Sequence, residues 1–271
     1  MSFNPNELIL EKIRAVEEYD PATNELVGRY TQIESPSLKT AATGTAVTDA
    51  MGAEITTFYN AQTGTFDFTN SLFSLDLAAS QFGTEKEISA DMKRPVSETV
   101  KVDGSHQAVL KYIPVGPEGA EITTVKVINY DNTFGKTYRI SAAGADGAPA
   151  DNESFVLDAE NKTLTFPSDV TGRVFVKYDA VTGNTVKITK SSDSIPKVRS
   201  LLVHALFHDP CDTNMVYAGV ISIPRAQIDP SAVELTLTSE GKHAASYKLQ
   251  KSYCDENAKL FDIIVSDYSV A

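Results

Sequence analysis

Short runs of β-branched and aromatic residues, separated by turns, make up most of this chain. Within the runs, Val, Ile, Thr, Tyr and Phe alternate with polar residues, so one face of each strand is apolar and the other polar. Gly, Pro, Asn and Asp interrupt the runs where the backbone must reverse. The pattern predicts a mainly β protein, a sandwich or barrel. The turns include "DPATNE" at Asp20, "AQTGT" at Ala61, "VDGS" at Val102, "GPEG" at Gly116, "DAENK" at Asp158, "VTGN" at Val181 and "SEGK" at Ser239.

Two hairpins are predicted near the start of the chain. Ile13–Ile33 reads as a long hairpin that turns at Asp20–Asn24, with a helix over its first half as the alternative. Glu54–Phe68 reads as a second hairpin that turns near Ala61.

One short helix follows the second hairpin. Asn70 or Ser71 is a suitable N-cap, because its side chain accepts a hydrogen bond from a free backbone N–H. Leu72, Leu75 and Ala79 follow at helical spacing, and Gly83 suits a left-handed C-cap. The helix is expected to flank a sheet through this apolar stripe.

Residues 95–196 form a candidate inserted domain between Pro95 and Pro196. Their short strands are typical of an immunoglobulin-like sandwich, although the Cys–Trp–Cys signature is absent. Residues 1–94 and 197–271 then form a discontinuous outer domain, a β-barrel or sandwich. The strands predicted inside the insertion are Thr99–Val102, Ala108–Pro114, Glu121–Asn129, Lys136–Ala142, Ser154–Leu157, Thr163–Phe166 and Arg173–Tyr178; those after it are Val198–His208, Met215–Ile223 and Val233–Leu237.

The charge is uneven along the 271 residues. The formal net charge is 24 − 36 = −12. Residues 1–90 contribute 5 − 13 = −8, residues 91–200 contribute 14 − 14 = 0, and residues 201–271 contribute 5 − 9 = −4. The neutral residues 91–200 therefore read as a different module from the acidic ends. The overall negative charge disfavours a protein that binds nucleic acid through its phosphates.

Cellular location is bounded by what the sequence lacks. The sequence contains no run of ~18 apolar residues that would predict a membrane anchor, and "MSFNPNELIL" does not resemble a secretory signal. Two cysteines are too few for a disulfide framework, which suits synthesis in a reducing cytoplasm.

The stretch "LLVHALFHDPC", Leu201–Cys211, is the main candidate for metal chemistry. His204, His208, Cys211 and Cys254 supply the ligand count of a zinc site. Strand alternation instead places His204 and His208 on one face with Leu202 and Leu206, and no paired Cys motif or carboxylate accompanies them. We predict a strand without a metal.

Two other motifs are weak catalytic or metal candidates. Ser194 and Lys197 have the Ser-x-x-Lys spacing, but Pro196 disfavours the helical turn that would bring them together. Asp146, Asp151 and Glu153 lack the register of an EF-hand, so a solvated loop is the expectation and weak cation binding stays open. No catalytic, cofactor or metal residue is predicted, and the chain is not expected to be an enzyme.

The order of elements from Ile13 to Glu87 resembles the tail tube (major tail) proteins of tailed bacteriophages. The features are the long hairpin, a polar extended segment, the "DAMGAEI" turn, the "NAQTG" hairpin and the capped helix. Tyr217–Tyr253, "YAGVISIPRAQIDPSAVELTLTSEGKHAASYKLQKSY", is similar to the last strands of that fold. The resemblance covers about two thirds of the chain. The length of the chain and its inserted domain depart from the simplest members of that family.

The resemblance implies a structural role in the virion. Such proteins form hexameric rings whose sheets join into one β-barrel, and stacked rings make a conduit for the tape measure protein and then DNA. The implied partners are further copies of the chain, the tape measure protein, and tail terminator and baseplate proteins. Acidic end segments suit a lumen that repels phosphates, so DNA passes without specific binding. The inserted domain would decorate the outside.

Candidate contacts between subunits or rings lie in the segment Ser35–Gly52. It is rich in small residues and weakly patterned, so we expect it to order against a neighbouring copy. The strands Val198–His208 and Met215–Ile223 are expected to offer edges for ring closure. The candidate contact residues are Ser37, Lys39, Thr43, Thr45, Val47 and Met51.

A receptor- or carbohydrate-binding virion module is the alternative function. The inserted domain would then be the recognition face. The absence of Trp weakens this reading, although 11 Tyr residues offer other aromatic platforms.

Overall fold

The chain divides into two compact units. The computed structural model describes residues 6–144, 147–212, 214–235, 241–251 and 258–269. The split unit comprises residues up to Lys86 and from Ile188 onward, and the inserted unit comprises Glu87–Lys187. These divisions lie before the boundaries at 94/95 and 196/197 expected from the two prolines, because Lys93 and Arg94 already belong to a strand of the inserted unit.

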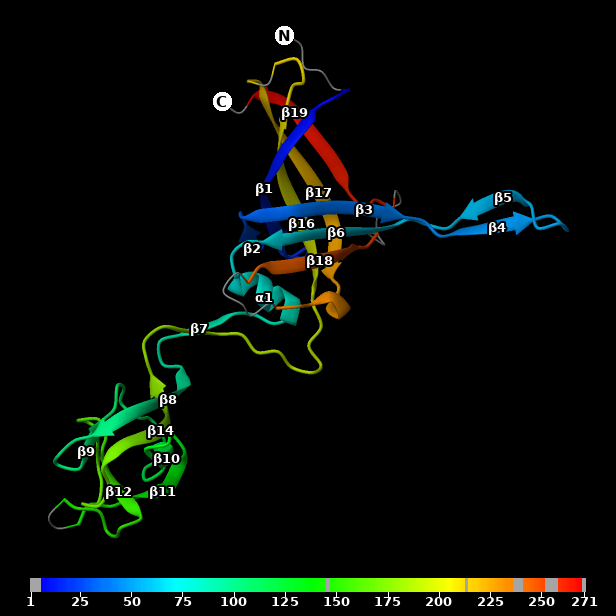
Figure 1. Ribbon diagram of the computed structural model, residues 1–271. Coiled ribbons are helices and arrows are strands. Elements are labelled where there is room, and N and C mark those ends of the chain that lie inside the picture. Colours follow the sequence, from blue (N-terminus) through cyan, green and yellow to red (C-terminus); the bar gives the residue numbers. More distant parts are fainter. Residues whose placement is uncertain (1–5, 145–146, 213, 236–240, 252–257, 270–271) are drawn as a thin grey trace. The chain divides into compact units, whose positions relative to one another are not determined.

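The split unit is built on one antiparallel sheet, confirming a mainly β fold (Figure 1). The strands follow the order β2-β1-β16-β17-β18-β6-β3, and β19 also pairs with β17. The order shows that strands far apart in the sequence are neighbours. The bounds are β1 Ile9–Tyr19, β2 Leu26–Tyr30, β3 Ile33–Ala41, β6 Thr63–Asn70, β16 Val198–His208, β17 Val216–Ile228, β18 His243–Leu249 and β19 Asp262–Ser269.

Strand β17 is shared between two parts of this sheet. Its last residues, Ala226–Ile228, pair with β18, whereas Tyr217–Ser222 pair with β19. The strands β3, β6 and β18 therefore cover one end of the β1-β16-β17 layer and enclose a core, while the other end continues with β19 beside it (Figure 1).

The core of the split unit is aromatic. Phe68 packs beside Tyr30 and Tyr247, with ring centroids 5.8 and 6.1 Å apart. Val16 and Val203, Cα partners on β1 and β16, are fully buried on the facing layer. Each buried side chain of this size contributes roughly 1.5–3 kcal/mol through loss of apolar surface.

Helix α1, Leu75–Phe82, closes one side of this core through the buried Leu77. Ser74 is the N-cap, and its hydroxyl accepts a hydrogen bond from the Leu77 N–H at 3.2 Å. The predicted caps Asn70 and Ser71 were wrong, because Asn70 is the last residue of β6. Gly83 is the predicted C-cap, with φ of 71°, and a Cβ there would lie 2.1 Å from the Ile195 carbonyl oxygen.

A carboxylate is buried between this helix and the sheet. Glu18 is fully buried and accepts hydrogen bonds from the Tyr30 hydroxyl at 2.7 Å and the Ser80 hydroxyl at 2.9 Å. The Arg199 Nε lies 3.4 Å from its other oxygen. Burial raises the pKa of Glu18, and these donors only partly offset that effect.

The inserted unit is a second β structure with its own core. Its strands follow the order β8-β14-β10-β11-β12-β13-β9, and the two ends of that path, β8 and β9, are joined by the turn Asp103–Gln107. A short pair, β7 Glu87–Ser89 with β15 Thr185–Lys187, accompanies it. The bounds are β8 Lys93–Val102, β9 Gln107–Val109, β10 Ile122–Ile128, β11 Phe134–Ser141, β12 Ser154–Asp158, β13 Thr163–Thr165 and β14 Gly172–Val181.

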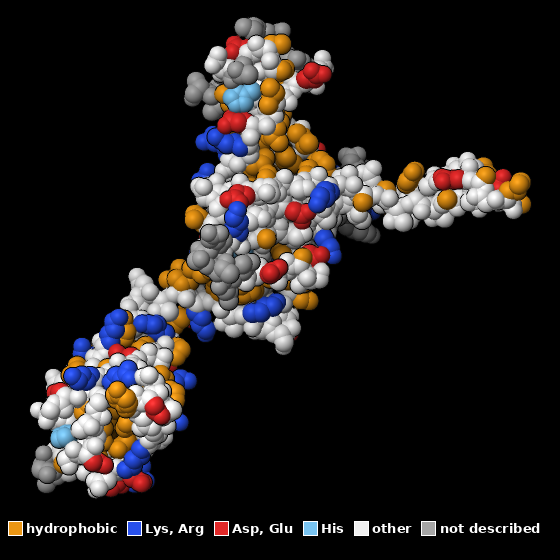
Figure 2. All heavy atoms as spheres, in the orientation of Figure 1, with side chains coloured by type: hydrophobic (Ala, Val, Ile, Leu, Met, Phe, Trp, Pro, Cys, Tyr) orange, Lys and Arg blue, Asp and Glu red, His pale blue; other side chains and the backbone are white. Residues whose placement is uncertain are grey.

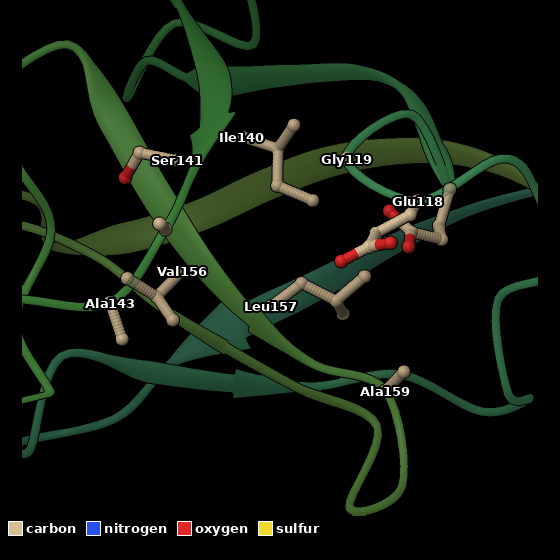
Figure 3. Close-up of a pocket in the computed structure, with 10 residues that line it drawn as sticks. Glu118, Gly119, Ile140, Ser141, Ala143, Val156, Leu157 and Ala159 are labelled. Carbon is tan, nitrogen blue, oxygen red and sulfur yellow. The ribbon is translucent and has the colours of Figure 1, made fainter.

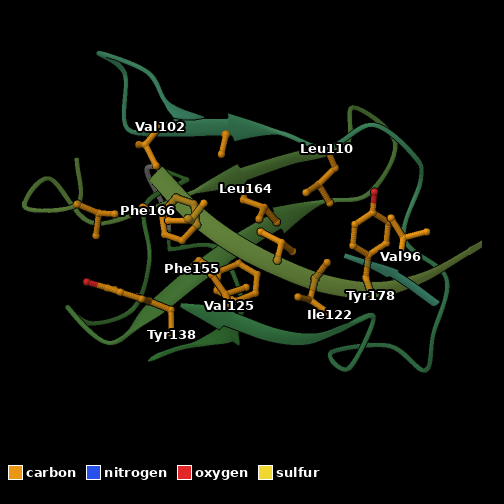
Figure 4. Packing of buried hydrophobic residues seen from close by; sticks show 14 of the residues in the cluster. Val96, Val102, Leu110, Ile122, Val125, Tyr138, Phe155, Leu164, Phe166 and Tyr178 are labelled. Carbon is orange, nitrogen blue, oxygen red and sulfur yellow. The ribbon is translucent and has the colours of Figure 1, made fainter. Parts of the chain in front are cut away.

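Alternation along β14 explains the core of the inserted unit. Val174, Val176 and Tyr178 point inward and are fully buried. They pack in one cluster with residues such as Phe155 and Leu164 (Figure 4). The strands predicted for this region all fall on observed strands, although β9 ends at Val109, well before Pro114.

Several predictions in the split unit can also be judged. The hairpin over Ile13–Ile33 is confirmed as β1 and β2. The predicted hairpin over Glu54–Phe68 is wrong, because β6 pairs with β3 and β18. Residues 233–235 of the predicted strand Val233–Leu237 are not in a strand, and the remainder lies outside the described residues. A 3-10 turn, Pro230–Ala232, precedes them.

Candidate assembly interface

Four strands of the split unit continue beyond its core. We call this part the extension: the first half of β1, the second half of β16, the first half of β17, and β19. Over Ile9–Ala15, β1 pairs with β16 alone among the described strands, and β19 pairs with β17 alone. The extension therefore has two outer edges, β1 on one side and β19 on the other.

The strands expected to offer edges are central instead. Val198–His208 forms β16, which pairs with β1 and β17. The segment Met215–Ile223 falls in β17, which pairs with β16 on one side and with β18 and β19 on the other. Sequence alternation assigned their faces correctly but carries no information on the order of strands, so the edge prediction was wrong.

One face of the sheet, from the extension to the neighbouring β1–β2 pair, carries paired charges. The His204 Nε2 lies 3.1 Å from a Glu17 carboxylate oxygen, and the Arg29 Nε lies 3.0 Å from the other oxygen. Closer to the end of β16, the His208 Nε2 lies 2.9 Å from Glu11. Lys12 is a further partner of Glu11 at 3.0 Å. Carboxylates of this face thus have basic partners, so the face is polar without being strongly acidic.

These contacts also set the protonation of the carboxylates. Burial acts to raise the pKa of Glu17, but hydrogen bonds with His204, Tyr19 and Arg29 outweigh it, so the pKa is lowered. The pKa of Glu11 is lowered by its hydrogen bonds with Lys12 and His208. Both side chains are therefore ionised at neutral pH.

The zinc candidates are distributed differently from a metal centre. His204 and His208 lie on the same face of β16, as predicted. The expectation that no carboxylate accompanies them was wrong, because β1 pairs with β16 and brings Glu17 and Glu11 beside them. Cys211 is an exposed free cysteine in the following loop, and Cys254 lies outside the described residues. Within the described part of the chain, no three His, Cys, Asp or Glu side chains are grouped to hold a metal.

A two-stranded arm is the second uncovered feature of the split unit. β4, Gly44–Thr48, pairs with β5, Glu54–Tyr59, and among the described strands each pairs only with the other. The Asn60 N–H donates to the Thr43 carbonyl at 2.9 Å at the base of the arm. The arm thereby continues the β3–β6 pair as one long hairpin (Figure 1).

The tip of the arm is a tight turn made by the "DAMGA" sequence. An Asp49 carboxylate oxygen accepts hydrogen bonds from the Met51 N–H at 2.9 Å and the Ala53 N–H at 2.8 Å. Gly52 has φ of 85°, a conformation that favours glycine. The reversal therefore occurs here and not near Ala61, which explains the wrong hairpin prediction.

Apolar side chains lie on both faces of the arm. By strand alternation Tyr59 and Ile55 share one face, and Phe58 shares the other with Val47. Phe58 is 67% exposed and Tyr59 72%. An isolated two-stranded hairpin is at best marginally stable in water, so both faces are suited to burial against other protein.

The predicted contact residues divide between the sheet and the arm. Ser37 and Lys39 lie on β3, where Lys39 forms an ion pair with Asp67 at 3.6 Å. The other candidates belong to the arm, and Met51 at its tip is 94% exposed. Sequence reasoning missed Ile55, Phe58 and Tyr59, although "EITTFY" carried the apolar signal. The arm candidates are Thr43, Thr45, Val47 and Met51.

Residues 8–261 match the model of the YomU/Tube protein family, across both units. The chain belongs to the YomU/Tube protein family. No curated protein sequence matches it. The family points to a phage tube-like structural protein and virion component, a class that is typically non-enzymatic.

The remaining catalytic candidates of this YomU/Tube family member lie apart. The Ser194 hydroxyl donates to the Ser191 carbonyl at 2.9 Å, whereas Lys197 pairs with Glu85 at 3.1 Å. Asp151 pairs with Arg139 and accepts from the Glu153 N–H, and Asp146 lies outside the described residues. None of the helices that the structure describes is long and apolar enough to span a membrane.

Proposed function

We propose that this chain assembles with copies of itself into hexameric rings that stack to form the tube of a phage tail. The observation that carries the proposal is the extension, an antiparallel sheet with an outer edge on each side. Edges with backbone donors and acceptors favour pairing with another strand. Membership of the YomU/Tube family supports the same role.

Strand direction makes head-to-tail joining possible. Along the order β1-β16-β17-β19 every neighbouring pair is antiparallel, so the two edge strands run in opposite directions. When a second copy is placed beside the first by rotation about a ring axis, its β1 runs antiparallel to the first copy's β19. The ladder continues across the interface, and repeated joining closes a ring.

The width of the resulting barrel favours six copies. Six extensions of four strands supply 6 × 4 = 24 strands. With strands ~4.8 Å apart and tilted by ~40°, a barrel of this size is ~48 Å across at the backbone. With side chains added inside such a barrel, the remaining channel is wider than a DNA duplex. Three copies would give a barrel of half this diameter, and side chains would fill most of its interior.

The arm supplies the contact between stacked rings. Its exposed Val47, Met51 and Phe58 side chains would be buried against the split unit of a copy in the next ring. Burial of such side chains contributes roughly 1.5–3 kcal/mol each, which offsets the cost of holding a two-stranded arm in one conformation.

The polar face of the extension would line the channel. Glu11 and Glu17 lie on this face with their basic partners, so few uncompensated cations remain to hold phosphates. The opposite face is continuous with the apolar core through Val203 and Ala205. DNA and the tape measure protein would pass along the polar face without specific binding.

The inserted unit would lie on the outside of the tube as an immunoglobulin-like decoration. In this role the protein is made in the host cytoplasm and incorporated into the virion. The tail terminator and baseplate proteins would contact the last rings of the tube.

Blocking one edge tests the proposal. Replacing the edge residues Ile263 and Ile264 of β19 with Lys and Pro should leave a folded monomer that does not form rings, because a charge and a missing N–H discourage strand pairing. Light scattering and negative-stain imaging give the readout. Rings that form equally well in this variant would contradict edge-to-edge joining.

A further inference from the structure

The outer face of the inserted unit carries a group of cations. Alternation along β14 buries Val174 and Val176 and turns Arg173, Phe175 and Lys177 outward. Lys101 on β8 and Lys126 on β10 are Cα partners of Arg173 and Phe175 and share this face. Four cations therefore surround one aromatic residue on adjacent strands; Figure 2 shows several Lys and Arg side chains exposed on this unit.

Two of these cations stand directly opposite each other. Lys101 and Arg173 are Cα partners on β8 and β14, where Cβ atoms are ~4.5–5.5 Å apart. Like charges in this arrangement destabilise a sheet. Neither residue has a carboxylate within ion-pair distance among the described residues; Arg173 donates to the Asn132 side-chain oxygen at 2.7 Å. The face is therefore suited to receive negative charge from a ligand.

A hollow adjoins the cationic face at Arg173. It has a volume of about 620 Å³ and lies at the β10–β11 turn. Ile128, Tyr130, Asn132 and Gly172 contribute to its lining. The Tyr130 side chain is fully exposed, which offers an aromatic surface beside the amide of Asn132. Charge, amide and aromatic groups thus meet at one end of the face.

The acidic residues of the inserted unit lie mostly elsewhere. Residues 87–187 contain 11 Lys and Arg and 14 Asp and Glu, a net charge of 11 − 14 = −3, so the cationic face is a local separation of charge. A second hollow, of about 360 Å³, has Glu118 and Glu121 in its lining with Ile140 and Leu157 (Figure 3). On the cationic face, Asp179 lies at the far end of β14 and Asp131 in the turn beside the first hollow.

The chemistry of the face favours a hydroxylated polyanion over a nucleic acid. Phe134 packs edge-on against Phe175, and Lys126 lies over the Phe134 ring, so both rings are already engaged by neighbours on this face, which disfavours base stacking there. Four further outward positions carry hydroxyl groups, which suit hydrogen bonding to sugars or polyols. They are Ser97, Thr99, Thr124 and Thr137.

We infer that the inserted unit binds an anionic polysaccharide through this face. Lys101, Arg173 and Lys177 would neutralise its phosphate, sulfate or carboxylate groups, and Tyr130 would stack against a sugar ring in the hollow. Arg173 and Lys177 are four residues apart, or ~13 Å along the strand, so they would contact successive charged groups of a polymer. The site does not depend on the proposed assembly of the split unit.

Binding of the full-length protein to dextran sulfate tests the inference, with uncharged dextran as the matched polymer. Dextran sulfate should bind, with an affinity that falls as salt rises, and dextran should not. The triple variant Lys101→Gln, Arg173→Gln, Lys177→Gln should lose at least tenfold in affinity. A control triple variant at lysines away from the face, Lys111→Gln, Lys136→Gln, Lys187→Gln, should stay within twofold of the natural protein.

Thermal unfolding separates a ligand role from a structural one. Because the Lys101–Arg173 pair is repulsive, its neutralisation should leave the melting temperature of the inserted unit unchanged or higher while binding is lost. Tyr130→Ala should also weaken binding without affecting the fold. Equal binding of dextran, retained binding in the triple variant, or tighter binding of an oligothymidylate of equal charge would overturn the inference.

Discussion

The two units differ in whether their strands continue beyond a buried core. In the inserted unit the ends of the strand path, β8 and β9, are joined by a tight turn, and the buried side chains form a closed cluster. In the split unit β1 and β19 are outer edges, and the arm exposes apolar residues on both faces. We therefore predict that copies of the chain join through the split unit and that the inserted unit folds independently.

Removal of the arm should have the largest effect. Replacing Thr43–Asn60 with an Asn-Gly turn keeps the β3–β6 ladder, so the split unit should fold with an unchanged melting temperature. Stacking of rings should be abolished, because the arm's apolar contacts are gone. Imaging and sedimentation provide the measurement, and long tubes formed by this variant would contradict the role of the arm.

Core substitutions should separate the two units. Phe68→Ala should destabilise the split unit by about 3–5 kcal/mol, and Phe155→Ala should destabilise the inserted unit by a similar amount, because each leaves a cavity in its own cluster. Calorimetry should show that each variant lowers one transition and leaves the other in place. A shift of both transitions by either variant would mean that the units unfold as one.

The buried Glu18 should give the split unit a specific dependence on pH. Burial raises its pKa above the ordinary value of 4.5, so its contribution to stability is fully present below that value and is lost as pH rises through the folded-state pKa. The variant Glu18→Gln has no carboxyl group that titrates at this position, so its stability does not fall in this way as pH rises. Relative to the natural protein it should gain stability as pH rises from 4 to neutral.

Urea unfolding of both proteins across that pH range measures the effect. The difference in unfolding free energy between the natural protein and Glu18→Gln should change with pH. A difference that stays constant would show that Glu18 remains ionised, held by Arg199, throughout the range.

Asp229 should have a smaller effect of opposite sign. Its hydrogen bond with Lys248, at 2.8 Å, and those with Ser231 lower its pKa to about 2. Its contribution is therefore present above pH 3.8 and lost as pH falls toward 2. Asp229→Asn should cost about 1 kcal/mol at neutral pH, since it weakens a cap and an ion pair. In acid unfolding, the free energy of unfolding should fall less steeply with decreasing pH in Asp229→Asn than in the natural protein. Identical slopes would contradict this prediction.

Sequence patterning predicted which face of a strand is buried better than it predicted which strands pair. Alternation placed His204 and His208 on one face of a strand and located the strands of the inserted unit, because burial follows a period of two. It could not show that β6 pairs with β3 and not with β5, since the sequences at Asp49–Ala53 and near Ala61 both contain a Gly among small and polar residues and only the first forms a turn. The edges β1 and β19 depend on contacts between opposite ends of the chain, which local patterns do not record.

The helix shows the same limit on a smaller scale. Gly83 was identifiable because its left-handed conformation favours one residue type. Asn70, Ser71 and Ser74 are all chemically suitable N-caps, and the length of β6 decides among them. The cationic face of the inserted unit was also hidden, because Lys101, Lys126 and Arg173 meet only when three strands are aligned.

The central claim is that the extension joins copies of the chain edge to edge. Electron cryomicroscopy of the purified protein, at concentrations where light scattering reports assembly, tests it most directly. The account predicts sixfold rings with a 24-stranded barrel in which β19 of one copy pairs antiparallel with β1 of the next. A protein that stays monomeric at every concentration and salt condition, or rings joined through the inserted unit, would contradict it.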